Sequence, residues 1–134
     1  MRRRKILIVD DEKGACDIIR LGFDATGEFE VHTAHNGMDG IYSARIHKPD
    51  IIILDICMPS MSGFEVLKRL KEDESTISIP VIVFSAMADD ESKCIAMELY
   101  SEAYLAEPFN MCEMIETVRT VLKRKYPEQE AEGK

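Results

Sequence analysis

The chain has 134 residues, of which 46% are hydrophobic and 31% charged, with a net charge of −8 and four cysteines. This length suits one domain with a single core, and no apolar run approaches the roughly 18 residues that a membrane span needs. The acidic balance argues against binding of nucleic acid by this domain alone, and the cysteines lack the CxxC spacing of zinc or redox sites, so we expect packed, reduced thiols in a cytoplasmic protein.

The apolar pattern alternates between short runs and helical spacing, which is typical of βα units that build a parallel sheet covered on both faces. A first strand is expected at Lys5–Val9, followed after Asp11 by a helix. A weaker second strand is expected at Glu30–Ala34, and Asn36-Gly37 then turns the chain into a helix that ends at Lys48-Pro49. The buried faces of these helices should hold Ala15, Ile18, Ile19 and Phe23 in the first and Gly40, Ile41 and Ala44 in the second.

The second half of the chain continues the same alternation. A third strand, Ile51–Asp55, is apolar until its last residue and is therefore expected in the centre of the sheet. The loop Met58–Gly63 leads into a helix, and a fourth strand, Val81–Phe84, ends at Ser85. The elements expected after it are a helix at about Asp90–Tyr100, a strand around Tyr104–Leu105 and a helix at about Asn110–Arg124. The buried face of the helix after Gly63 should hold Phe64, Val66, Leu67 and Leu70.

This order predicts a doubly wound, five-stranded parallel sheet with five helices, of the flavodoxin-like class. We expect residues 1–126 to form the domain. Residues 127–134 are polar and acidic, which predicts a tail or the start of a linker.

Carboxylates follow two of the expected strands. Asp10 and Asp11 end the first strand, and Asp55 ends the third. Because the carboxyl ends of parallel strands share one edge of a sheet, these three side chains should meet there. Two carboxylates about 4 Å apart repel by roughly 4 kcal/mol at an effective dielectric of 20, so the group needs a cation, a proton or water between its members. An all-oxygen acidic site suits Mg²⁺ and a phosphate better than zinc.

Together with residues at the ends of the later strands, this set resembles the receiver domain of bacterial response regulators, over about Lys5 to Arg124. The matching positions are Asp10-Asp11 for the acidic pair, Asp55 for the phosphoacceptor, Gly63 for the glycine that closes its loop, Ser85 for the hydroxyl switch, Tyr104 for the aromatic switch and Pro108-Phe109 after the last strand. The resemblance implies a receiver-type fold and a role in two-component or phosphorelay signalling, not enzymatic turnover of a substrate.

The resemblance also implies roles for these residues. Mg²⁺ would be held by Asp10, Asp11, Asp55 and the backbone carbonyl of Cys57. Asp55 would accept a phosphoryl group from a histidine kinase or phosphotransfer protein, Ser85 would donate a hydrogen bond to it, and Tyr104 would move inward. The signal would reach a downstream protein, or a second copy of the chain, through the face at about Asp90 to Arg124.

One position departs from the family pattern. The family places a lysine directly before the proline that follows the fifth strand, and this chain has Glu107 there. A carboxylate about 4 Å from a phosphoryl charge replaces an attraction by a repulsion of roughly 4 kcal/mol at an effective dielectric of 20. Glu107 therefore either points to solvent, adds a ligand to the metal, or marks a pseudo-receiver that binds partners without phosphate.

A third class of function, a metal-dependent phosphatase or phosphotransferase, is disfavoured. It would need a second carboxylate two residues beyond Asp55 as acid and base, and Ile56-Cys57 stands there instead. Cys57 and Met87 occupy positions where the family orients an attacking water, and because neither side chain hydrogen-bonds water well, a slow loss of phosphate is expected.

Overall fold

The computed structural model describes residues 3–59, 61–85, 95, 98–99, 101–106 and 110–127. Five strands form one sheet in the order β2-β1-β3-β4-β5, and every neighbouring pair is parallel. The strands are β1 (Arg4–Val9), β2 (Phe29–Ala34), β3 (Ile51–Asp55), β4 (Val81–Ser85) and β5 (Ala103–Ala106). The helices are α1 (Lys13–Asp24), α2 (Gly37–His47), α3 (Gly63–Lys71) and α5 (Met111–Lys125).

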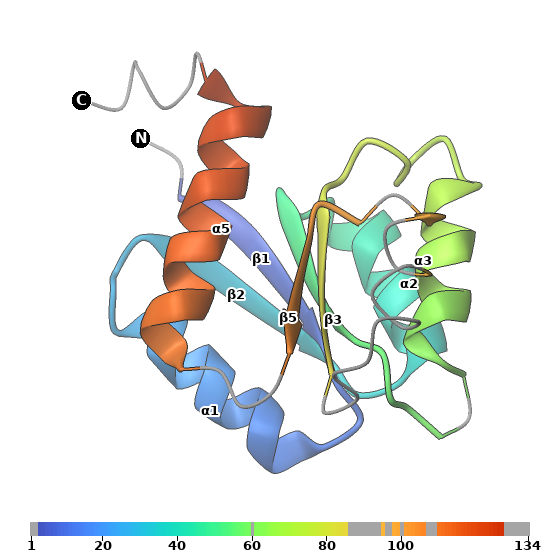
Figure 1. The fold of residues 1–134 in the computed structure, drawn as a ribbon, viewed down its shortest axis with the longest axis horizontal. Helices are drawn as coiled ribbons and strands as arrows, with labels where there is room; N and C mark the ends of the chain where they lie inside the picture. Colours follow the sequence, from blue (N-terminus) through green and yellow to red (C-terminus); the bar gives the residue numbers. More distant parts are fainter. Residues whose placement is uncertain are drawn as a thin grey trace.

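Helices cover both faces of the sheet, with α1 and α5 on one side and α2 and α3 on the other (Figure 1). Successive side chains of a strand point to opposite faces, so β1 contributes to two separate cores. Ile6 and Ile8 pack with the residues of α1 and α5, whereas Leu7 and Val9 pack with those of α2 and α3. All four are at most 1% exposed, and the predicted doubly wound architecture is confirmed.

Short polar side chains start three of the helices. Asn36 accepts a hydrogen bond from the backbone N–H of Asp39 at 2.8 Å, and Asn110 accepts one from Glu113 at 2.8 Å. Ser62 does the same for Glu65 at 3.3 Å. Each satisfies a backbone donor that has no partner within its helix, and this fixes where the helix begins.

Most of the expected elements are confirmed to within a residue or two, and two details of burial are wrong. Ile18 was expected on the buried face of the first helix, yet it is 64% exposed, because Cys16, Ile19 and Phe23 form that face. Cys57 and Cys112 were expected to be packed, yet both are exposed free thiols; Cys16 is buried. The helix expected at Asp90–Tyr100 falls almost wholly outside the described residues.

Among the described helices, none is long and apolar enough to cross a bilayer.

Candidate functional site

The predicted acidic cluster forms at the carboxyl edge of the sheet. Asp10 follows β1, Asp55 ends β3, and these two strands are neighbours. Asp10, Asp11 and Asp55 each contribute a carboxylate oxygen to a group whose members lie within 4.8 Å of one another. Asp10 is 2% exposed and Asp55 9%, whereas Asp11 is open to solvent. Within the described part of the chain, no other set of three or more His, Cys, Asp or Glu side chains converges in this way.

Burial and neighbouring like charges raise the pKa of two carboxyl groups in this cluster. Burial, followed by the charge of Asp10, raises the pKa of Asp55 to about 7. Burial also raises the pKa of Asp10, opposed in part by the backbone N–H of Glu12, which donates to Asp10 Oδ1 at 3.0 Å. Burial and the neighbouring carboxylates thus favour the neutral carboxyl, and an oxygen-rich, partly open acidic cluster has the donor set that Mg²⁺ prefers. These residues therefore fit a hard divalent cation.

The loop after β3 folds back over the end of the strand. The N–H of Cys57 donates to Asp55 Oδ1 at 3.1 Å, and the N–H of Gly63 donates to the carbonyl of Ile56 at 2.9 Å. A Cβ atom at Gly63 would lie 2.4 Å from the backbone oxygen of Asp55, closer than non-bonded atoms can approach. The glycine is thus required by space, because the start of α3 presses directly on the backbone of Asp55.

Ser85 and Tyr104 lie on the neighbouring strands β4 and β5. Ser85 ends β4, is fully buried, and its hydroxyl oxygen lies 3.2 Å from the sulfur of Cys57. Tyr104, on β5, is paired with Val83 of β4 and is half-buried against the core formed with α2 and α3. Glu107 and Pro108 fall outside the described residues, so the structure does not place the departure from the family pattern.

The contact between Cys57 and Ser85 was not predicted from the sequence, which gave Cys57 a backbone ligand for Mg²⁺ and a side chain that orients water poorly. The pairing of β3 with β4 sets Asp55 beside Phe84, so the residue after Phe84 and the loop after Asp55 emerge side by side. The contact depends on the register between β3 and β4. The register of a strand pair cannot be predicted from the apolar pattern of one strand.

The chain matches the model of the response regulator receiver domain over residues 6–119. It is 34% identical over 120 residues to the DNA-binding dual master transcriptional regulator RpaA of Synechocystis, covering 90% of this chain and 49% of that protein. It is 34% identical over 124 residues to the phosphate regulon transcriptional regulatory protein PhoB of Pseudomonas aeruginosa, covering 92% of this chain and 54% of that one. The chain thus spans about half the length of these curated relatives.

Solved structures give the same result. The Vibrio cholerae chemotaxis protein CheY4 superposes with a TM-score of 0.84 at 27% identity, covering 90% of this chain and 99% of that one. The receiver domain of the Francisella response regulator 1452 gives 0.83 at 30% identity, covering 91% and 98%. The family model spans most of the sequence and the sheet order and acidic cluster agree with it, so the chain belongs to the response regulator receiver domain family of two-component signalling.

Proposed function

We propose that this chain accepts a phosphoryl group on Asp55, with Mg²⁺, from a histidine kinase or phosphotransfer protein. The observation that carries the proposal is the meeting of Asp10, Asp11 and Asp55 within 4.8 Å at the carboxyl edge of the sheet. Such a cluster has a strong need for a cation and an open position for a charged donor. Family membership supports the same chemistry.

Asp10, Asp11, Asp55 and the backbone carbonyl of Cys57 would hold the ion. Mg²⁺, when bound, supplies positive charge that offsets the carboxylates and the incoming phosphoryl oxygens. An oxygen of Asp55 attacks phosphorus, the bond from phosphorus to the donor's nitrogen or oxygen breaks, and the donor leaves with that electron pair. The product is an acyl phosphate on Asp55, and the transfer depends mainly on position and charge.

The surrounding residues orient this step. The Cys57 N–H, 3.1 Å from Asp55 Oδ1, fixes the rotation of the carboxylate and leaves its other oxygen for attack. The Ser85 hydroxyl, at the end of the adjacent strand, is the donor we assign to a phosphoryl oxygen. Tyr104 is the aromatic side chain that we expect to change position when Ser85 does.

Glu107 favours a second candidate, a pseudo-receiver that binds its partner without phosphate. It stands where the family has a lysine, and a carboxylate near the phosphoryl group would repel it. The intact acidic cluster and the buried Ser85 support phosphorylation as the first candidate.

Intact-protein mass distinguishes the two. Wild type, Asp55→Asn and Glu107→Lys are incubated with Mg²⁺ and a small acyl-phosphate donor. One phosphoryl increment on wild type that is absent from Asp55→Asn supports phosphorylation on Asp55. An adduct on Glu107→Lys but none on wild type would support the pseudo-receiver. An unchanged adduct on Asp55→Asn would contradict the assignment of the phosphoacceptor.

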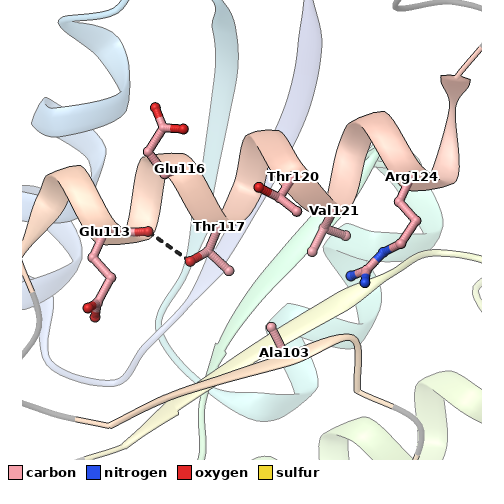
Figure 2. A pocket seen from close by; sticks show the side chains of 7 residues that line it. All are labelled: Ala103, Glu113, Glu116, Thr117, Thr120, Val121 and Arg124. Carbon is pink, nitrogen blue, oxygen red and sulfur yellow. Dashed lines mark hydrogen bonds between the residues drawn. The ribbon is translucent and has the colours of Figure 1, made fainter.

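We also propose that residues 1–126 act as the receiver unit, with 127–134 as tail or linker, and that partners contact the face formed by residues 90–124. In the described part of that face, α5 and the start of β5 border a pocket of about 320 Å³. Figure 2 shows its lining side chains, with the Thr117 hydroxyl donating to the carbonyl of Glu113. The pocket lies toward the amino end of β5, whereas the acidic cluster lies past the carboxyl ends, so the pocket suits contact with protein more than phosphoryl chemistry.

Light scattering of wild type and Thr120→Arg, each with and without the acyl-phosphate donor, tests this placement. Loss of a donor-dependent dimer in Thr120→Arg supports a homodimer. A dimer that Thr120→Arg leaves intact would contradict this placement.

A further inference from the structure

Cys57 touches two of the residues to which the proposed function assigns roles. Its backbone N–H donates to Asp55 Oδ1 at 3.1 Å, and its sulfur lies 3.2 Å from the hydroxyl oxygen of Ser85. Cys57 is exposed, so its side chain is not placed by core packing, whereas Ser85 is fully buried. One loop residue therefore bridges the phosphoacceptor and the hydroxyl switch.

Either atom can donate in this contact, and the hydroxyl is the better donor of the two. A thiol is a weak donor and its sulfur a weak acceptor, whereas a serine hydroxyl carries one proton that it gives readily. A hydroxyl that gives its proton to sulfur cannot give the same proton to a phosphoryl oxygen. A charged phosphoryl oxygen is the stronger acceptor, by about a factor of two over a neutral one, so the exchange is favourable once the phosphoryl group arrives.

We propose that Cys57 is a positioning residue whose sulfur holds the Ser85 hydroxyl in the unphosphorylated site, so that phosphoryl transfer to Asp55 requires Ser85 to exchange this sulfur for a phosphoryl oxygen. The inference rests on the proposed function. In this proposal the side chain of Cys57 helps to set the rate at which Asp55 is phosphorylated. The weak sulfur acceptor makes the holding contact easy to break.

The proposal predicts an order of rates at position 57. Cys57→Ala removes the competing acceptor and should raise the initial rate of phosphorylation by Mg²⁺ and a small acyl-phosphate donor about two- to fivefold, the range expected for one weak hydrogen bond. Cys57→Ser supplies a stronger acceptor and should lower the rate by a similar factor. A role in packing alone would make both variants slower than wild type.

A double-mutant cycle tests whether the effect passes through Ser85. In a Ser85→Ala background, Cys57→Ala and Cys57→Ser should leave the rate unchanged relative to Ser85→Ala alone, because the shared hydroxyl is gone. Substitutions at position 57 that act equally with and without Ser85 would overturn the proposal.

A measurement without any donor separates this proposal from the proposed function. The rate of alkylation of Cys57 by iodoacetamide, followed by peptide mass, should fall in Ser85→Ala, because a hydroxyl that donates to sulfur stabilises the reactive thiolate. The exposed Cys112 on α5 serves as the internal control. Equal alkylation of Cys57 in wild type and Ser85→Ala would overturn the contact. If no variant forms an adduct on Asp55, the proposed function fails, and the contact is judged by alkylation alone.

Discussion

The two ends of β3 carry buried aspartates in opposite environments. Asp50, directly before the strand, is 7% exposed, and Asp55, its last residue, is 9% exposed. Asp50 accepts the backbone N–H of Lys5 at 2.7 Å and lies 3.4 Å from the guanidinium of Arg4. Asp55 lies instead among the carboxylates of Asp10 and Asp11.

The difference separates a carboxylate paired with a cation from one that lies among other carboxylates. At the amino edge, a cation and a backbone donor compensate the buried charge of Asp50, so it joins β1 to β3. At the carboxyl edge, burial and the neighbouring carboxylate of Asp10 disfavour charge on Asp55, and this cluster is the site that we propose for Mg²⁺. The same residue type at equal burial should therefore have opposite effects on stability when its charge is removed.

The largest expected effect is at the amino edge. Asp50→Asn keeps the shape but removes the charge that pairs with Arg4, and it should lower the free energy of unfolding by about 2 kcal/mol, as for other buried hydrogen bonds to charged groups. Urea unfolding followed by circular dichroism measures it, with Asp17→Asn on the exposed face of α1 as a control expected to change stability by less than about 0.5 kcal/mol. A higher free energy of unfolding for Asp50→Asn than for wild type would contradict this comparison of the two edges.

The carboxyl edge should respond with the opposite sign. In EDTA at pH 8, Asp55→Asn should raise the free energy of unfolding by about 1–2 kcal/mol, a part of the roughly 4 kcal/mol by which two charges 4 Å apart repel at an effective dielectric of 20. Mg²⁺ should stabilise wild type and have a much smaller effect on Asp55→Asn, since the ion relieves the same repulsion. Thermal unfolding with and without Mg²⁺ checks both, and a destabilised Asp55→Asn in EDTA would contradict the account.

The pH dependence follows from the raised pKa of Asp55. That pKa is about 7 in the folded protein against 3.8 for the free group, so between these values the folded state binds more protons than the unfolded state. The stability of the metal-free protein should therefore fall as pH rises from about 4 to 7, the reverse of the change for a salt-bridged aspartate. Unfolding measured across this range should show a shallower fall in Asp55→Asn. Equal slopes in the two proteins would show that Asp55 carries no uncompensated charge.

The contrast between the two aspartates also marks how far sequence reasoning reached. The position of Asp55 could be predicted, because an apolar run that ends in a carboxylate indicates both a buried strand and the edge of the sheet at which the carboxylate lies. The role of Asp50 could not be predicted, because it depends on Arg4 and on the end of α5, which are distant in sequence. The contact of Cys57 with Ser85 could not be predicted for the same reason, since it joins residues distant in sequence. Ile18 was wrongly predicted to be buried, because apolar residues at helical spacing can define more than one possible buried face of α1.

The smallest expected effect concerns the end of α5. The Tyr126 hydroxyl donates to the carbonyl of Asp50 at 3.0 Å, and the Arg4 guanidinium lies 4.4 Å from the centre of the Tyr126 ring. Tyr126→Phe keeps the ring under Arg4 and removes the hydroxyl, so it should cost about 1 kcal/mol, as one neutral hydrogen bond does. Urea unfolding measures the loss, and amide exchange in the last turn of α5 should quicken. Because the change is confined to the amino edge, the stabilisation by Mg²⁺ should match that of wild type. A weakened Mg²⁺ response in Tyr126→Phe would show that the two edges of the sheet are coupled rather than independent.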